Sequence, residues 1–316
     1  MREARPDAGA GRRFSTGAGF SLARDVFRER PLSFLRLAAI QIVVFALAGV
    51  GQFWLLGVFG QGVVDAQGDP AALARASALI SVFSLLGSAV FIVLWAWVEG
   101  LWLGLFVEGR AAFRPSMGGF FRILAAFLII YALVFVAAIA LSVFGTLAAI
   151  PILMAASTEP EPIILILVIS ACILVPLLLF AFLVLIRFSA LPALAALKGG
   201  MPMGQAWQGA GRRLGALMAA WLTWSLIYLL VLGVAGVVLA FGPGPYLDAM
   251  TAAFTNLDDP AAQYRVYAAF ARSPGEIAAF TITVAITNTI FVPVLALARG
   301  IGVALALDDE AAAKPA

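Results

Sequence analysis

The feature that most constrains the fold of this chain is a series of six long apolar stretches. About 20 consecutive apolar residues cross the hydrocarbon core of a bilayer as one helix. The stretches are residues 37–74, 76–98, 123–158, 163–186, 214–247 and 277–298. The first, third and fifth are longer than one span needs, and we interpret the excess, which is rich in glycine, proline or polar residues, as loops. The sequence therefore predicts six membrane spans.

The composition excludes a water-soluble fold. Of the 316 residues, 63% are hydrophobic and only 12% are charged, and the mean hydropathy is +1.05. A soluble domain has about 25% charged residues, so this chain cannot cover a surface that faces water. Soluble domains also need about 50 residues or more, and no segment outside the apolar stretches offers that length. We predict an all-α polytopic integral membrane protein.

The six spans form three similar pairs. The first run of each pair is opened by an arginine and ends in Phe-Gly, at Phe59-Gly60, Phe144-Gly145 and Phe241-Gly242. A loop and a second apolar run follow. We predict one membrane domain over 19–308, made of repeats at about 19–107, 108–198 and 199–308. Residues 1–18 are predicted to be a disordered cytoplasmic tail, and residues 309–316 a cytoplasmic C-terminal tail.

Amphipathic segments are expected between the spans. The segments around 20–31, 113–120 and 203–210 have apolar residues at helical spacing, which favours helices that lie in the headgroup plane, although simple connections are the alternative. The third outer loop, about 243–275, predicts two short amphipathic helices, either a lid or partner surface or a loop folded back on the bundle. Ser273 is the predicted N-cap of the sixth span and Pro274 its first residue.

The distribution of basic residues predicts that both termini are cytoplasmic. Arginines and lysines of short loops stay on the cytoplasmic side. The segment up to Arg36 holds eight arginines, and the connections after the second and fourth spans hold three basic residues each. The intervening loops, near Asp69, Glu161 and Asp259, are poor in them. Abundant alanine and glycine with little lysine are typical of a GC-rich bacterium, so we predict a multi-pass protein of the bacterial cytoplasmic membrane.

Three charges occupy the same place in the three pairs. Glu99, Arg187 and Arg299 each end the second apolar run, and each is followed by more apolar sequence near the cytoplasmic boundary. Ionisable side chains at this depth are expensive and usually pair with one another inside the bundle. We therefore expect Glu99 to be the counter-charge of either Arg187 or Arg299, which leaves one arginine over.

With the arginines that open the odd spans, these residues predict a basic layer at the inner mouth of the bundle. One interpretation is that the layer only anchors the spans to phosphates. The other is a site for an anionic phospholipid, since the planar fork of arginine matches phosphate. The candidate headgroup ligands are Arg36, Arg122, Arg187, Arg213 and Arg299.

The remaining residues offer little chemistry. Polar side chains inside the spans, among them Gln41, Thr283, Thr287 and Asn288, are explained by interhelical hydrogen bonds, or by the lining of a solute path. Histidine is absent and only one cysteine occurs. No phosphate-binding glycine loop or nucleophile elbow is present. We therefore expect no metal, no cofactor, no enzyme activity and no nucleic-acid partner.

A short passage resembles a known family. Residues 186–194, Ile-Arg-Phe-Ser-Ala-Leu-Pro-Ala-Leu, are followed by Ala206-Trp207 and by Gly211-Arg212-Arg213. The passage resembles bacterial six-span proteins, namely the membrane-domain family attached to some glycerophosphodiester phosphodiesterases and the YciC-like inner-membrane proteins. The resemblance implies the six-span fold. It implies no hydrolase, because this chain has neither the phosphodiesterase domain nor any histidine.

The function predicted from the sequence is a non-enzymatic membrane protein that binds anionic lipid at the cytoplasmic leaflet, in envelope or lipid homeostasis. The alternatives are a small-solute transporter or channel, and a membrane partner subunit of a larger complex. Transporters often carry inverted repeats, whereas repeats of two spans keep one orientation, which favours lipid. Protein partners and oligomeric state stay open.

Overall fold

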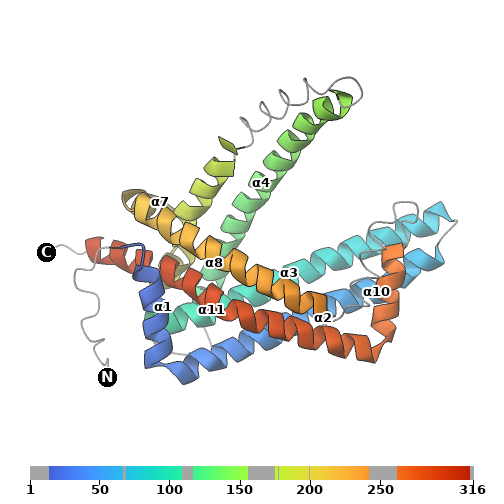
Figure 1. The fold of residues 1–316 in the computed structure, drawn as a ribbon, viewed down its shortest axis with the longest axis horizontal. Coiled ribbons are helices and arrows are strands. Elements are labelled where there is room, and N and C mark those ends of the chain that lie inside the picture. Colours follow the sequence, from blue (N-terminus) through green and yellow to red (C-terminus); the bar gives the residue numbers. More distant parts are fainter. Residues whose placement is uncertain are drawn as a thin grey trace. The chain divides into compact units, whose positions relative to one another are not determined.

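The computed structural model describes residues 14–66, 69–108, 117–155, 175–176, 178–198, 200–241 and 262–313. Apart from short turns these residues are α-helical, and no strand occurs among them (Figure 1). The helices are α1 (Ala18–Glu29), α2 (Pro31–Asp65), α3 (Pro70–Glu108), α4 (Met117–Ala155), α6 (Leu191–Lys198), α7 (Met203–Arg212), α8 (Leu214–Phe241), α10 (Ala262–Arg272) and α11 (Pro274–Ala313). Residues 178–188 are also helical.

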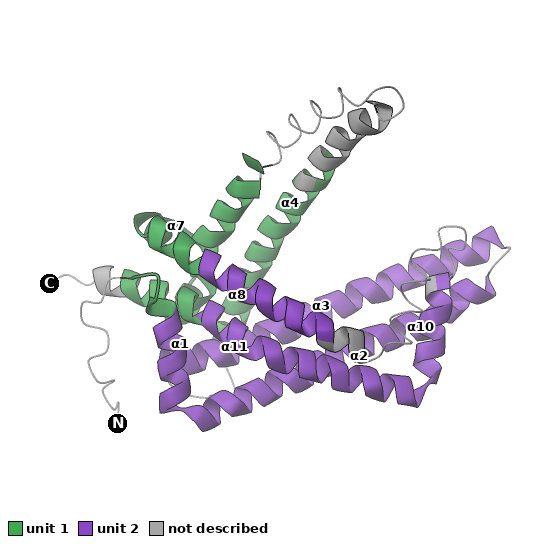
Figure 2. Cartoon of the chain, viewed as in Figure 1, with its two compact units in different colours: residues 1–19, 116–221, 300–316 green, residues 20–115, 222–299 purple. Residues whose placement is uncertain are grey.

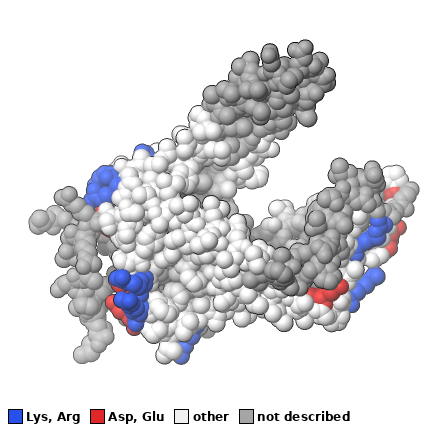
Figure 3. Space-filling view, viewed as in Figure 1, with Lys and Arg blue, Asp and Glu red and all other residues white. Residues whose placement is uncertain are grey.

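Within these ranges, six helical segments are long and apolar enough to cross a membrane. They are Pro31–Asp65, Pro70–Val107, Gly118–Ala140, Leu178–Lys198, Leu214–Val237 and Pro274–Asp309. A helix suits such segments because it satisfies its own backbone N–H and C=O groups, which lipid cannot do. On the face drawn in Figure 3, the charged side chains of the described residues are confined to a few patches. The predicted all-α class is confirmed, and the six segments indicate a multi-pass membrane protein.

The chain forms two compact units (Figure 2). Unit 1 comprises residues 1–19, 116–221 and 300–316, and unit 2 comprises residues 20–115 and 222–299. The three-repeat organisation stays a prediction.

In unit 2, α2 and α3 form an antiparallel hairpin. Four pairs of side chains connect them: Gln41 with Trp102, Phe45 with Trp95, Phe59 with Phe83, and Val63 with Ile80. A step forward along α2 thus corresponds to a step backward along α3. Aromatic stacking contributes about 0.5–1.5 kcal/mol per pair beyond its buried area, so the two stacked pairs help to fix this register.

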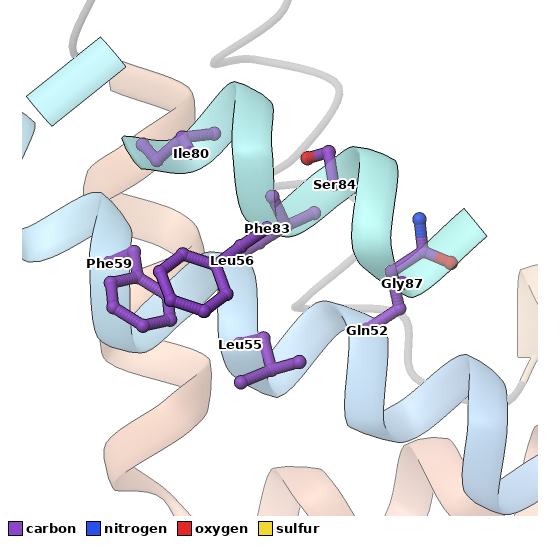
Figure 4. Close-up of a pocket in the computed structure, with 8 residues that line it drawn as sticks. All are labelled: Gln52, Leu55, Leu56, Phe59, Ile80, Phe83, Ser84 and Gly87. Atoms are coloured by element: carbon purple, nitrogen blue, oxygen red, sulfur yellow. The ribbon is translucent and has the colours of Figure 1, made fainter. Parts of the chain in front are cut away.

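A small cavity lies between α2 and α3 (Figure 4). Its volume is about 10 Å³, roughly the room that one water molecule needs. Gln52 and Ser84 are the polar side chains of its lining, and the Gln52 side chain lies beside Gly87 of α3. The cavity is too small for a solute larger than water.

Helix α10 lies directly on α2 in the same unit. A Cβ at Gly57 would overlap the backbone carbonyl of Tyr267 and the side chain of Ala271. Tyr267 also belongs to a buried cluster with Phe270 and Phe280. Its burial raises the pKa of its hydroxyl, and the electrostatic effect of the neighbouring Tyr264 is a second, smaller cause. One of the two helices predicted for the third outer loop is thus present as α10. The other, at 246–257, lies outside the described residues.

Two helices begin at the caps that their sequences favour. Ser273 Oγ accepts a hydrogen bond from the Glu276 N–H at 3.4 Å, and Pro274 is the first residue of α11, so the predicted start is confirmed. Asp69 Oδ1 similarly accepts the N–H groups of Ala71 and Ala72, at 2.9 and 3.2 Å, ahead of α3. Such caps satisfy donors that have no partner inside the helix.

Both ends of the chain differ from the sequence prediction. Helix α11 continues past the expected boundary at 308 to Ala313. Phe14, expected in a disordered tail, is buried, and its N–H donates to Asp308 Oδ1 at 3.1 Å within unit 1. The physical reason is that Asp308 and Asp309 are helical residues with partners in the protein. They are not part of a solvated tail.

Candidate functional site

The candidate arginines fall into two groups. Arg299 and Arg213 each pair with a carboxylate, of Glu99 and Asp308 respectively. Arg36, Arg122 and Arg187 make no ion pair with any residue that the structure describes. Among the described residues, therefore, only the second group has no carboxylate to balance its charge.

The pair of Glu99 and Arg299 lies inside unit 2. Arg299 Nε donates to Glu99 Oε1 and Oε2, at 3.0 and 2.9 Å, and Nη2 donates to Oε1 as well. Glu99 is 5% exposed and Arg299 is 7% exposed. The predicted pairing of Glu99 with one of the two arginines is confirmed, and the partner is Arg299 of α11. A buried pair of this kind is costly to break, because the remaining charge stays buried without compensation.

Gln41 of α2 forms a cluster with Glu99 and Arg299. Its Oε1 accepts hydrogen bonds from Trp102 Nε1 at 2.8 Å and from Arg299 Nη2 at 3.1 Å, and its side chain is fully buried. The guanidinium carbon of Arg299 lies 4.7 Å from the centre of the Trp102 ring. The cluster therefore joins α2, α3 and α11 through one amide, one ion pair and one cation–π contact.

The other interior polar residues do not join the cluster. Thr283 Oγ1 donates to the Ala279 carbonyl and Asn288 Nδ2 to the Val284 carbonyl, each at 2.9 Å. These bonds lie within α11, where the sequence had favoured bonds to another helix. Thr287 Oγ1 is buried and has no hydrogen-bond partner within the described part of the chain. None of the predicted lining residues borders the cavity of Figure 4.

Arg187 has a different setting, in unit 1. Its guanidinium carbon lies 4.3 Å from the centre of the Trp207 ring, on α7. The centre of the Phe188 ring lies 5.6 Å from the centre of the same Trp207 ring. Stacking of this kind contributes about 0.5–2 kcal/mol. It occupies the face of the guanidinium, while the N–H groups lie at its edge. These N–H groups have no hydrogen-bond partner among the described residues, and Arg187 is only half-buried.

Helix α7 presents its large apolar side chains outward. Its buried side consists of Ala206, Gly209 and Ala210. Met203 and Trp207 are 40% and 38% exposed. The sequence placed the two alanines on the same apolar side as Met203 and Trp207, and the structure separates them. The reason is close packing at Gly209, which lies so near the Asp309 carboxylate that it leaves no room for a Cβ.

Sequence reasoning missed Asp308 and Asp309. Asp308 Oδ2 lies 3.1 Å from Arg213 Nε, and Asp309 Oδ1 lies 3.8 Å from Arg212 Nη2. Asp309 is buried. The available signal was two adjacent acids directly after the apolar run that ends at Leu307. Because Asp308 balances Arg213, that arginine is no longer a surplus charge.

The two other unpaired arginines have simpler surroundings. Arg36 is exposed on α2. Arg122 Nε donates to the Gly118 carbonyl of its own helix at 2.9 Å. Arg187 is thus the one candidate arginine that the described residues show with both an aromatic wall and an unbalanced charge.

Comparisons of the chain with protein-family models, with curated proteins and with solved structures found no match. The functional argument therefore rests on the geometry of the two clusters.

Proposed function

We propose that this chain is a non-enzymatic protein of the bacterial cytoplasmic membrane that binds an anionic lipid headgroup at the inner leaflet, through Arg187 and Trp207. The observation that supports it best is the setting of Arg187. This arginine ends an apolar helix, stacks on the indole of Trp207, and has no carboxylate partner among the described residues. A phosphate diester supplies both the charge and the acceptor atoms that such an arginine lacks.

The exposed side of α7 supports a position at the membrane interface. Tryptophan prefers the headgroup level, where its ring is in apolar surroundings and its N–H is near water. An amphipathic helix with exposed apolar side chains and a terminal arginine lies in the plane of that interface. Met203 and Trp207 are exposed, and Arg212 ends the helix. In this position α7 would hold Arg187 at the depth of lipid phosphates.

The proposal keeps only one of the five arginines that the sequence suggested as headgroup ligands. Arg299 and Arg213 are balanced by acids within the protein, so neither has a charge to offer a phosphate. We further propose a role in envelope or lipid homeostasis. Holding a lipid requires no reacting group, so this role agrees with a non-enzymatic protein. The cavity in Figure 4 has room for about one water molecule, so it does not support the transporter alternative.

Arg187→Gln is expected to weaken retention of phosphatidylglycerol by about tenfold or more. A hydrogen bond to a charged group contributes about 1.5–3 kcal/mol, and 1.4 kcal/mol corresponds to a factor of ten. The measurement is native mass spectrometry of the protein from nanodiscs that contain phosphatidylglycerol and phosphatidylcholine, with lipid adducts counted for each variant.

Arg75→Gln is the matched control, because Arg75 is exposed on α3 and is predicted to face the opposite leaflet. It should leave the phosphatidylglycerol adducts unchanged, and retention of phosphatidylcholine should be equal in all variants. Equal phosphatidylglycerol retention by the wild type and Arg187→Gln would show that Arg187 only anchors its helix.

The orientation is part of the same proposal and has its own test. Both termini are proposed to be cytoplasmic, because the arginines cluster on that side of the spans. In a Cys172→Ala background, Gln67→Cys should react with a membrane-impermeant maleimide in intact cells, whereas Ala10→Cys should react only after lysis. Labelling of Ala10→Cys in intact cells would reverse the topology and would move Arg187 to the other leaflet.

A further inference from the structure

The cluster of Gln41, Glu99 and Arg299 in unit 2 has more hydrogen-bond donors than acceptors. Arg299 uses Nε and Nη2 on the two acceptor groups beside it. Arg299 Nη1 and Gln41 Nε2 are buried and have no hydrogen-bond partner among the residues that the structure describes. Each carries two N–H groups. A buried donor without an acceptor has lost its hydrogen bonds to water and gains none in return, so two such donors in one cluster destabilise it.

The orientation of the Gln41 amide cannot be reversed to remove this surplus. Both groups that face Gln41 Oε1, Trp102 Nε1 and Arg299 Nη2, are obligate donors. Turning the amide would set an N–H against two other N–H groups. Gln41 Nε2 must therefore point away from both, and its two hydrogens must find an acceptor elsewhere.

The charge of the cluster restricts what that acceptor can be. Glu99 and Arg299 balance each other, so the cluster is neutral before anything binds. An anion would bring a buried charge that nothing compensates. A cation would meet only N–H groups. The remaining class is a neutral group with an oxygen atom that accepts hydrogen bonds.

We propose that the cluster binds a neutral oxygen acceptor, supplied by a water molecule or by the ester carbonyl of a glycerolipid, through Arg299 Nη1 and Gln41 Nε2. This site is separate from Arg187 and takes a different class of ligand. Two arginines at equivalent places in the sequence thus have different tasks. Arg187 meets an anion, whereas Arg299 meets a neutral oxygen, because only Arg299 has a carboxylate beside it.

Radiolytic hydroxyl labelling in ¹⁸O-water, read by mass spectrometry, tests the water source in the wild-type protein. A bound water produces radicals next to buried side chains that bulk solvent does not reach. Trp102, Phe106 and Phe270 are all fully buried. With rates normalised to the reactivity of the free amino acids, Trp102 should incorporate label while Phe106 and Phe270 do not. Gln41→Met should lower the labelling of Trp102 to that of Phe106 and Phe270.

Native mass spectrometry tests the lipid source. Diacylglycerol offers ester carbonyls without a charge, and its dialkyl ether analogue lacks them. If an ester lipid is bound, the protein should retain diacylglycerol and lose the ether analogue, and Trp102 should not be labelled. Absence of both Trp102 labelling and selective ester retention in the wild type would overturn the proposal. So would phosphatidylglycerol retention that is lost in Gln41→Met but kept in Arg187→Gln.

Discussion

Glu99→Gln is expected to lower the free energy of unfolding by about 3–5 kcal/mol, the usual cost of removing one partner from a buried ion pair. The glutamine keeps the shape of the side chain, but it cannot balance the charge of Arg299, which is 7% exposed. The guanidinium would remain charged and buried. The measurement is denaturant or thermal unfolding in a mild detergent, followed by circular dichroism.

The double variant Glu99→Gln/Arg299→Gln separates the pair from its surroundings. Removing both charges should recover part of the loss, because no uncompensated charge then remains. Asp25→Asn is the matched control, since Asp25 pairs with Arg24 at 3.3 Å on the surface, and exposed pairs contribute at most about 1 kcal/mol. If the effects at Glu99 and Arg299 simply add, the two side chains do not stabilise the fold as a pair.

Gly57→Ala is expected to destabilise unit 2 by about 1–3 kcal/mol, the range for overpacking of a well-packed contact. The new Cβ would overlap the Tyr267 carbonyl and the Ala271 side chain. Because a backbone group cannot rotate away, α10 has to move off α2. The measurement is the unfolding midpoint, together with hydrogen exchange of residues 262–272.

Gly51→Ala on the same helix is the matched control. Nothing lies within 4 Å of the position that its Cβ would take. Alanine also favours a helix over glycine by about 0.5–1 kcal/mol, so this variant should be equal to the wild type or more stable. Similar unfolding midpoints for Gly51→Ala and Gly57→Ala would show that the contact with α10 does not contribute to stability.

The sequence predicts the elements of this fold well because their causes are local. The apolar runs specify helices without reference to any neighbour. Ser273 accepts a hydrogen bond from the first turn of α11, and Pro274 has a backbone angle that suits the first helical position. The burial of Glu99 is also consistent with the apolar residues on both sides of it in the sequence. These features need only the period of the helix and the thickness of a bilayer.

What the sequence could not decide depends on contacts between distant residues. Arg187 and Arg299 follow apolar runs of the same kind, so only the packing of α3 against α11 chooses the partner of Glu99. The aromatic walls, Trp207 beside Arg187 and Trp102 beside Arg299, have the same origin. The predicted tail starts at Asp309, directly after Asp308, and the bonds of Asp308 to Phe14 and Arg213 are visible only in the structure.

The long separation between Glu99 and Arg299 has a consequence for biosynthesis. The two residues are 200 positions apart in the chain. Ribosomes add about 5–20 residues per second, so Arg299 is made about 10–40 s after Glu99. During that interval α3 must enter the membrane with an acid that has no arginine to neutralise it. We therefore expect α3 to be inserted stably only after the helix that carries Arg299 has been made.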